Sequence, residues 1–315
     1  MNKEILVSVI CITYNHEKYI RECLDSILKQ KVNFNYELII HDDASSDNTV
    51  NIINEYKEKY KIIKPILQKE NQYSKGKKAS KIAVEQSVGK YIAICEGDDY
   101  WYSNDKLQKQ IDYMEKNKDC KFCFTDYYLL NQKDMSLNKK MIISDKNKFN
   151  AGELDSLGAI ATASYVIRRD SIIPLPEWYE SAISGDIALE LISTSRGYAY
   201  HINEPLVVYR VGTGTSLMDK WRKDSKDKNK EIERLNRVIN FYININEYTN
   251  YKYNHYFKKS ISRNKALSYL LDKNLYKSEL KKIKKDLSNR MKIRLFIGNY
   301  FPSLYKKIER KLYER

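Results

Sequence analysis

The pattern of apolar and polar positions in the first two thirds of the chain predicts strands that alternate with helices. Residues 5–12 are almost continuously apolar and rich in β-branched side chains, which is typical of a strand covered on both faces of a parallel sheet. The next segment has the spacing of an amphipathic helix, with apolar residues at Ile20, Cys23, Leu24, Ile27 and Leu28. This change of pattern indicates a strand followed by a helix.

The same alternation continues as far as residue 125. Further strands are expected at residues 36–40, 66–67, 91–95 and 121–125, and helices from about residue 48, around residues 79–83 and over residues 107–114. Pro65 marks the strand at residues 66–67 as short or as an edge strand. Alternating strands and helices require right-handed crossovers, so the expected fold class is α/β, with a mixed, mostly parallel sheet flanked by helices.

The sequence after residue 125 is less regular. Residues 127–150 are polar and weakly periodic, and we expect a variable connection there. Further along, three strands and one helix are expected, at residues 161–168, 198–201 and 206–209 and at residues 186–195. We therefore place an α/β domain at residues 1–218.

The last part of the chain differs in charge. The formal net charge is +15, yet residues 1–218 contain 29 Lys and Arg against 30 Asp and Glu, whereas residues 219–315 contain 27 against 11. Helix-forming residues dominate the second segment, so we expect a basic helical C-terminal region at residues 219–315. A tail rich in Lys and Tyr leaves open a nucleic-acid-binding protein, but no recognised binding motif supports it, and we expect no nucleic-acid partner.

The cysteines and the first apolar run indicate the cellular compartment in which the protein is expected. All five cysteines lie in the first 123 residues without the spacing of a disulfide-stapled domain, which favours a reducing compartment. Cys120 and Cys123 form a lone C-x-x-C in a predicted strand, where a metal or redox role is not expected. Residues 5–12 are not followed by a cleavage site, and no run reaches membrane-spanning length, so we expect a cytoplasmic protein.

Polar and acidic residues follow three of the predicted strands. They are Thr13, Tyr14 and Asn15 after the first strand, His41, Asp42 and Asp43 after the second, and Glu96, Asp98 and Asp99 after the strand at residues 91–95. Ligands of parallel α/β sheets bind at the carboxyl ends of the strands. We therefore expect a binding site where these segments meet.

The three carboxylates at residues 96–99 favour a divalent cation. Adjacent like charges are costly unless a cation lies beside them, and hard cations such as Mn²⁺ or Mg²⁺ prefer oxygen ligands. The alternative is that these residues cap a turn, for which one carboxylate is enough. At the second cluster, capping by Ser46 or Asp47 and ligand binding by Asp43 are equally supported by the residues.

Four separated segments together resemble glycosyltransferase family 2, which has the GT-A fold. They are residues 7–16, residues 25–30, residues 42–47 and residues 96–101, in the family's order. The similarity covers roughly residues 4–215. It implies a metal-dependent transferase of bacterial surface-polysaccharide assembly, which moves a sugar from a nucleotide-sugar, commonly a UDP-sugar, to an acceptor hydroxyl.

The resemblance also assigns roles to single residues. Thr13 and Asp43 match positions that contact the nucleotide base, and Tyr14 and Asn15 lie in the same motif. Asp98 matches a residue near the ribose and the metal, and Asp99 matches a metal ligand. A lysine near the diphosphate is expected among Lys75, Lys77, Lys78 and Lys81, of which Lys81 is our choice.

Asp186 matches the position of the family's catalytic base. Inverting transfer needs one carboxylate that takes the proton of the acceptor hydroxyl, and capping of the following helix is the alternative role for Asp186. Many relatives carry a His after the segment at residues 209–211 that helps to hold the metal, whereas this chain has Gly212. Metal binding would then depend on Asp99, phosphate oxygens and water.

The end of the chain has the spacing of a basic amphipathic helix. Its apolar positions are Ile297, Tyr300, Phe301, Leu304, Ile308 and Leu312, with Lys306, Lys307, Arg310 and Lys311 between them. Such a helix lies on an anionic membrane surface, or it packs on the catalytic domain or on a second copy of the chain in a homodimer.

The expected acceptor is a glycan or a lipid-linked glycan. A nucleotidyltransferase is a competing hypothesis, but the first strand is not followed by a Gly-rich loop.

Overall fold

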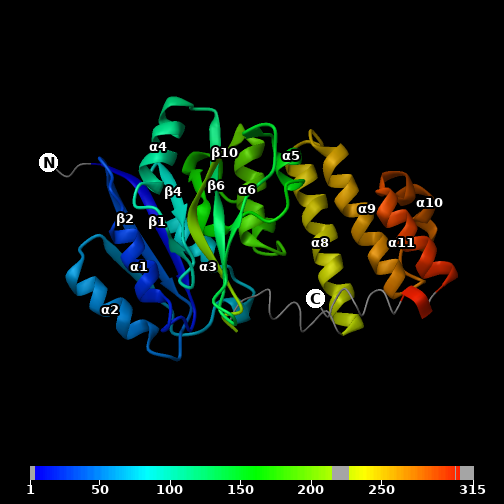
Figure 1. The fold of residues 1–315 in the computed structure, drawn as a ribbon. Coiled ribbons are helices and arrows are strands. Elements are labelled where there is room, and N and C mark those ends of the chain that lie inside the picture. Colours follow the sequence, from blue (N-terminus) through cyan, green and yellow to red (C-terminus); the bar gives the residue numbers. More distant parts are fainter. Residues whose placement is uncertain (1–3, 215–226, 302, 306–315) are drawn as a thin grey trace. The chain divides into compact units, whose positions relative to one another are not determined.

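The computed structural model describes residues 4–214, 227–301 and 303–305. The chain divides into two compact units (Figure 1). The first comprises Met1–Glu180 and Ser184–Lys220, and the second comprises Ser181–Ile183 and Trp221–Arg315. Each unit is described by itself below.

The first unit is built on one mixed sheet, ten-stranded within the described residues. Its strands are β1 Ile5–Thr13, β2 Asn35–Asp42, β3 Ile63–Leu67, β4 Tyr91–Ile94, β5 Tyr100–Trp101, β6 Cys120–Asn131, β7 Leu137–Lys140, β8 Lys148–Phe149, β9 Val166–Arg168 and β10 Tyr198–Val211. Their order is β3-β2-β1-β4-β9-β6-β10-β5, with β7 on β6 and β8 on β10. The first four strands and the β6–β10 pair are parallel, while β9 is antiparallel to both of its neighbours. The predicted mixed, mostly parallel sheet is therefore confirmed.

Helices flank this sheet. They are α1 Ile20–Leu28, α2 Thr49–Lys59, α3 Ala79–Gln86, α4 Lys106–Lys116, α5 Ala151–Asp155 and α6 Gly185–Ser195. Val7, Val9 and Cys11 of β1 pack in one core with the buried face of α1. The intervening Ser8 lies against Gly89, where a Cβ atom would come within 2.5 Å of the Ser8 backbone nitrogen. Because both faces of β1 are buried, its run of apolar residues is nearly continuous.

Three expectations about irregular segments were wrong. Residues 127–150 are not a plain connection, because β6 continues to Asn131 and the segment then forms β7 and β8 and ends at Asn150, the N-cap of α5. Of the strand expected at residues 161–168, Val166–Arg168 forms β9, whereas residues 162–164 form a 3₁₀ helix. The two expected last strands are one strand, β10, whose pairing with β6 is shifted around Pro205. Register shifts at this proline interrupt the apolar pattern without ending the strand.

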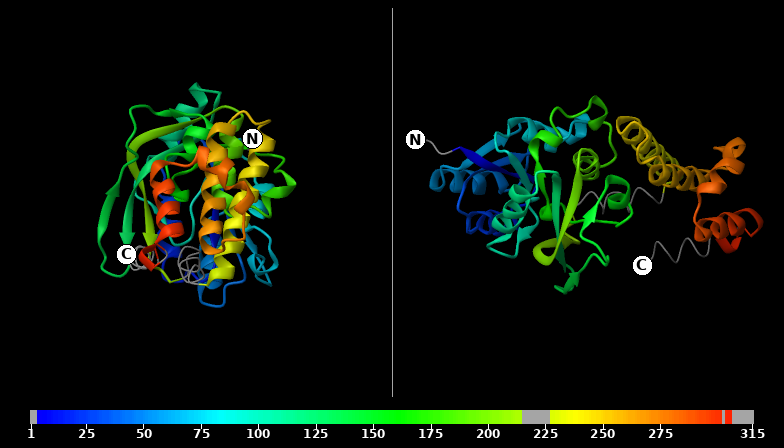
Figure 2. Two further views of the ribbon diagram at one scale, coloured as in Figure 1. Left: turned by 90° about the vertical axis from the view of Figure 1, so that its right-hand side faces the viewer. Right: turned by 90° about the horizontal axis from the view of Figure 1, so that it is seen from above.

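The second unit is helical and basic, as the sequence predicts. Its described helices are α8 Lys228–Tyr248, α9 Asn254–Leu271, α10 Leu280–Ile283 and α11 Asn289–Tyr300. The long helices α8 and α9 lie side by side (Figure 2). A small core joins α9 to α10 and α11 through Ala266, Leu270, Ile283, Leu287, Met291 and Leu295. Ile308, Leu312 and the basic residues 306–311 of the predicted amphipathic stripe lie outside the described residues.

Neither unit contains, within its described residues, a helix long and apolar enough to cross a membrane. All five cysteines are free and buried. Cys120 and Cys123 lie in β6, as expected, and burial raises the pKa of both thiols. They are core residues, which agrees with the interpretation of the C-x-x-C as part of a strand.

Candidate active site

The carboxyl ends of β1 and β4 bring the first and third polar segments together. The two strands pair in parallel, and the Gly97 amide donates to the Ile12 carbonyl at 2.9 Å. A Cβ atom on Gly97 would lie 2.8 Å from Thr13 Oγ1 and 2.9 Å from His16 Nδ1. Only glycine allows this approach, so Gly97 sets the position of the acidic segment beside the end of β1.

Asp98 and Asp99 have different surroundings in this segment. Asp99 is fully buried, its Oδ1 accepts the Arg210 amide at 2.8 Å, and its Oδ2 has no hydrogen-bond partner among the described residues. Burial, followed by the charges of Asp98 and Glu96, raises the Asp99 pKa well above its usual range. Asp98 lies 3.8 Å from His16 Nε2 and is partly exposed. A buried carboxylate oxygen without a partner, beside two further carboxylates, favours a cation at this point.

Arg210 holds the acidic segment in place, a role that no sequence motif indicates. Its backbone nitrogen binds Asp99, and its guanidinium donates to the Asp98 carbonyl at 2.5 Å and pairs with Glu22. The guanidinium also lies over the rings of Tyr19 and Tyr100, at 5.2 Å and 4.8 Å from their centroids. Since Arg210 follows Asp99 by 111 residues, no local motif joins the two.

Asp186, in the first turn of α6, acts electrostatically on Glu96 of the acidic segment. Thr162, in the 3₁₀ helix η2 (Thr162–Ser164), donates to Asp186 Oδ2 at 3.3 Å and also interacts with Glu96. Ser184 donates to the other carboxylate oxygen of Asp186. Thr162 therefore bridges two carboxylates from separate elements. The sequence contains no motif that marks it.

Burial is the largest cause of the raised pKa values of Glu96, Asp99 and Asp186. It raises the Asp186 pKa above the usual range, and the charge of Lys78 opposes that rise. Burial also raises the pKa of Glu96 to about 8, with further contributions from Asp98 and Asp186. The Tyr209 pKa is raised by burial and then by the charges of the same four carboxylates. Glu96, Asp98, Asp99, Asp186 and Tyr209 thus form one electrostatic cluster, which we call the acidic edge.

Asp43 is more engaged than the sequence suggested. Its Oδ1 accepts the Gln72 amide at 2.7 Å and its Oδ2 accepts the Tyr73 amide at 3.1 Å. Both carboxylate oxygens therefore have protein partners, which no sequence pattern indicated. Helix α2 begins at Thr49 after the N-cap Asn48, and Asp47 accepts the Thr49 amide at 3.0 Å. Contact of Asp43 with a base stays a prediction, because each carboxylate oxygen can accept a second hydrogen bond.

Asn15 has a structural role in its loop, whereas Thr13 is buried and Tyr14 is exposed. Asn15 has a left-handed backbone with φ of 56°, its amide donates to Ser45 Oγ at 2.9 Å and its side chain accepts the Ser46 amide at 2.8 Å. It therefore joins the loop after β1 to the loop after β2. Thr13 Oγ1 is buried without a described partner, while Tyr14 is exposed.

The lysines that could lie near the diphosphate differ in their contacts. Lys75 pairs with Glu70, and Lys81 pairs with Glu180 at 3.3 Å. The side chain of Lys78 lies beside α6, since a Cβ atom on Gly185 would be 3.4 Å from its Cδ. Its charge also acts on Asp186. The geometry thus favours Lys78, rather than our choice Lys81, as the lysine beside the acidic edge.

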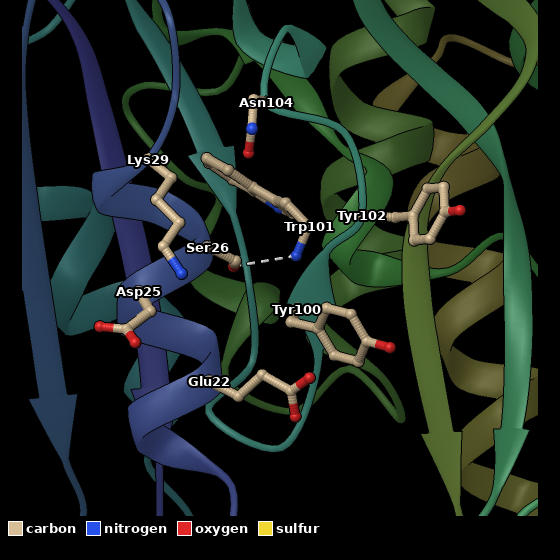
Figure 3. Close-up of a pocket in the computed structure, with 8 residues that line it drawn as sticks. All are labelled: Glu22, Asp25, Ser26, Lys29, Tyr100, Trp101, Tyr102 and Asn104. Carbon is tan, nitrogen blue, oxygen red and sulfur yellow. Dashed lines mark hydrogen bonds between the residues drawn. The ribbon is translucent and has the colours of Figure 1, made fainter.

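A pocket of about 400 Å³ lies beside this site and contains none of the predicted donor-binding residues. Figure 3 shows its walls, which are the side chains of Glu22, Asp25 and Ser26 on α1, of Lys29 directly after α1, and of Tyr100, Trp101, Tyr102 and Asn104. The Trp101 amide donates to Ser26 Oγ at 3.0 Å across the pocket wall. Glu22 and Tyr100 also contact Arg210, so the pocket adjoins the support of the acidic segment.

Within the described residues, no group of three or more His, Cys, Asp or Glu side chains is arranged to hold a metal ion. The acidic edge fits a different mode, in which one or two carboxylates and substrate phosphates share the cation. Gly212, at the position where the family resemblance leads us to expect a His, has φ of 77°, a backbone conformation in which a side chain is strained. The chain therefore offers no ligand at that position.

Comparison with known sequences places the chain among sugar transferases. A family model described as Glycosyl transferase family 2 matches residues 8–173. An uncharacterized protein of Mycobacterium bovis is 33% identical over 62% of this chain, and the chain covers 60% of that relative's length. The putative teichuronic acid biosynthesis glycosyltransferase TuaG of Bacillus subtilis is 31% identical, over 74% of this chain and 91% of the relative.

A further relative and two solved structures extend this comparison. The Escherichia coli protein WfaP, a UDP-Glc:α-D-GlcNAc-diphosphoundecaprenol β-1,3-glucosyltransferase, is 30% identical over 71% of this chain and 84% of its own length. Staphylococcus aureus TarS 1–349 with UDP-GlcNAc has a TM-score of 0.62 at 15% identity, covering 94% of this chain and 87% of TarS 1–349. The Pyrobaculum calidifontis mannosyltransferase PcManGT with GDP-Man and Mn²⁺ has a TM-score of 0.52 at 14% identity, covering 95% and 85%. These structures show that the fold is GT-A.

Proposed function

This chain belongs to glycosyltransferase family 2, and from that premise we propose that it transfers a sugar from a nucleotide-sugar to an acceptor hydroxyl with inversion at the anomeric carbon. The observation that carries the proposal is the acidic edge. Asp186 of α6 and the β4–β5 carboxylates come from separate parts of the chain, and Thr162 links them. A transferase needs both groups, one beside the acceptor and one beside the diphosphate.

Asp186 is the proposed general base. Inverting transfer requires one carboxylate that takes the proton of the acceptor hydroxyl while the anomeric carbon is attacked from the opposite side. A raised carboxylate pKa brings a base closer to the operating pH, which makes it more effective. Thr162 and Ser184 hold the two carboxylate oxygens and so fix the direction in which Asp186 faces.

Asp98 and Asp99 are the proposed metal-binding residues. Asp99 Oδ2 has no described partner, and the neighbouring charges of Asp98 and Glu96 favour a cation there. Mn²⁺ or Mg²⁺ at this place would neutralise the charge of the departing nucleotide diphosphate. The proposed donor is a UDP-sugar, with Thr13 and Asp43 toward the base, Tyr14 and Asn15 beside it, and Lys78 or Lys81 toward the diphosphate.

The proposed acceptor is a glycan or a lipid-linked glycan of a bacterial surface polysaccharide. Two relatives support this, because the printed name of TuaG refers to teichuronic acid and that of WfaP to a diphosphoundecaprenol-linked sugar. We place the enzyme in the cytoplasm at the inner face of the cell membrane, and the five free cysteines agree with a reducing compartment. A homodimer is compatible with this proposal.

The experiment is UDP release from UDP-glucose and UDP-GlcNAc with Mn²⁺, with and without a GlcNAc-diphosphate-lipid acceptor, for the wild type and Asp186→Asn. We expect Asp186→Asn to lower kcat by roughly 10²- to 10⁴-fold with little change in the donor KM. Because the base must be deprotonated, wild-type activity should rise with pH through a pKa above the usual aspartate range.

Asp170→Asn is the matched control, since this carboxylate is exposed and lies outside the acidic edge. It should keep wild-type activity. If Asp186→Asn transferred sugar at the wild-type rate, the assignment of the base would be wrong. If the wild type released UDP from neither donor, and no other nucleotide-sugar replaced them, the proposed activity itself would be rejected.

A further inference from the structure

Helix α11 in the second unit has two apolar faces, and only one of them is covered. Met291, Leu295 and Gly298 face the small core shared with α9 and α10. Residues Ile293, Phe296 and Tyr300 follow the i, i+3, i+7 spacing on the opposite side. Their exposed fractions are 59%, 55% and 70%. A single amphipathic helix needs one apolar face, so the second requires an explanation.

The orientation of α11 about its own axis is fixed by close packing. Gly298 lies against α9 so tightly that a Cβ atom there would come within 2.3 Å of Leu270 Cδ2. Leu295 is almost fully buried on the same side. Rotating the helix to hide Phe296 would expose Leu295 and push the backbone at Gly298 away from α9. The exposed side chains are thus a consequence of the fold.

The exposed side chains form a continuous surface. The Phe296 ring centroid lies 4.9 Å from that of Tyr300 and 6.1 Å from that of Phe301. Phe301 and Leu304 extend the surface beyond the helix, with exposed fractions of 51% and 47%. We call Ile293, Phe296, Tyr300, Phe301 and Leu304 the aromatic face. Contiguous exposed apolar surface of this kind marks an interaction site.

The charges around the aromatic face identify its partner. Exposed basic side chains lie within α11, at Arg290 and Lys292, and precede it in the chain, at Lys281, Lys282, Lys284 and Lys285. By helical spacing, Arg290 and Lys292 lie on the two sides of the aromatic face. The acidic residue in residues 280–301 is Asp286, which pairs with Lys258 at 3.2 Å. Aromatic side chains bordered by Lys and Arg fit the boundary between the headgroups and acyl chains of an anionic bilayer.

We propose that the aromatic face binds the surface of anionic lipid bilayers, with its rings among the headgroups and its lysines and arginines on the lipid phosphates. The proposal deepens the proposed function, because it names the surface that would keep a transferase near a lipid-linked acceptor. It does not depend on donor chemistry. Vesicle binding and UDP release can therefore fail separately.

The test is co-sedimentation of the full chain with vesicles of phosphatidylcholine alone and of phosphatidylcholine with 30% phosphatidylglycerol. The wild type should bind the anionic vesicles at least about tenfold more tightly than the neutral ones, and salt should weaken that binding. Phe296→Ser/Tyr300→Ser should reduce anionic-vesicle binding about tenfold or more. Arg290→Glu/Lys292→Glu should also reduce it about tenfold.

Two matched controls separate the aromatic face from general effects. Val88→Ser/Ile143→Ser replaces exposed apolar residues of the first unit, and Lys116→Glu/Lys118→Glu replaces exposed lysines there. Both should bind vesicles as the wild type does. All variants change exposed side chains, so their thermal unfolding and UDP release without acceptor should be unchanged, which would show that they are folded.

Three outcomes would overturn the proposal. Wild-type protein that bound anionic vesicles no better than neutral ones would exclude the electrostatic partner. Phe296→Ser/Tyr300→Ser that bound as the wild type does would show that the aromatic face is not the contact. Sedimentation that showed self-association of the wild type, lost in the same variant and without vesicle binding, would make the aromatic face a contact between copies of the chain.

Discussion

Single side chains decide how charge is distributed at the acidic edge. Asp99 is buried with one free oxygen, Asp98 is partly exposed beside His16, and Asp186 is held by two hydroxyl groups. Their different surroundings give them different proposed tasks, although all three are aspartates. Lys78 is the cation whose charge acts on Asp186.

We predict that Lys78→Ala shifts the acid limb of the pH–rate profile for UDP release to higher pH. Removing a nearby positive charge raises the Asp186 pKa further, so less of the base is deprotonated at low pH. On the acid limb of the profile, kcat/KM should therefore fall below the wild-type value. Lys81→Ala is the matched control, because Lys81 pairs with Glu180 instead. Equal effects of the two substitutions at every pH would contradict the distinction between these lysines.

The residues that the sequence could not identify are those that act over long chain separations. Asp99 and Asp186 were predicted because they lie in short motifs next to predicted elements, and their roles stay predictions. Arg210 supports Asp99 from a position 111 residues away, and Thr162 contacts Asp186 from a separate element, and no residue pattern joins either pair. Asp43 is a further case, since two amides of the following loop donate to its carboxylate and no sequence pattern indicated them.

At the scale of elements, β5 and α4 continue directly from the acidic segment. Trp101 of β5 is buried and its indole N–H donates to the Ala163 carbonyl at 2.9 Å. Lys106, the first residue of α4, is fully buried with its Nζ 4.4 Å from the Trp101 ring centroid. Its Nζ has no hydrogen-bond partner among the described residues, and burial lowers its pKa to about 7.

We predict that Lys106→Met stabilises the protein at neutral pH and less so at alkaline pH. The folded pKa lies below the unfolded value of 10.5, so the native state binds fewer protons and wild-type stability rises between about pH 7 and pH 10. The advantage of the methionine variant should therefore shrink by about 3 kcal/mol between pH 6.5 and pH 9.5. Urea unfolding at both pH values measures this difference.

Lys116→Met, on the exposed side of the same helix, is the control for this prediction. It should show no such pH dependence. An advantage of Lys106→Met that stayed constant with pH would mean that Lys106 is not forced toward its neutral form. A loss of stability at every pH would mean that the contact with Trp101 outweighs the cost of burial.

Long periodic elements were predictable, whereas the irregular strands were not. Strands β1, β2 and β4 are buried on both faces and α1 on one, which leaves a clear pattern in the sequence. Strand β10 carries a proline and register shifts, and β7 is exposed along its whole length, so neither has a regular alternation. Where tertiary pairing rather than local pattern forms the strand, sequence reasoning fails.

At the scale of the whole molecule, two parts of the chain differ in net charge and in proposed function. The near-neutral residues 1–218 include the acidic edge, and the basic residues 219–315 include the aromatic face. We propose donor chemistry for the first part and membrane contact for the second. Because these proposals rest on different residues, a variant of one part should leave the other property intact.

The central claim is that Asp98 and Asp99 hold a divalent cation together with a sugar nucleotide. Isothermal titration of UDP-GlcNAc and UDP-glucose with Mn²⁺ into the wild type, Asp98→Asn/Asp99→Asn and the exposed control Asp112→Asn/Asp119→Asn tests it most directly. We expect binding that needs Mn²⁺, weakens at least about tenfold in the first variant and is unchanged in the control. Equal binding by all three proteins, or binding that persists unchanged in EDTA, would contradict it.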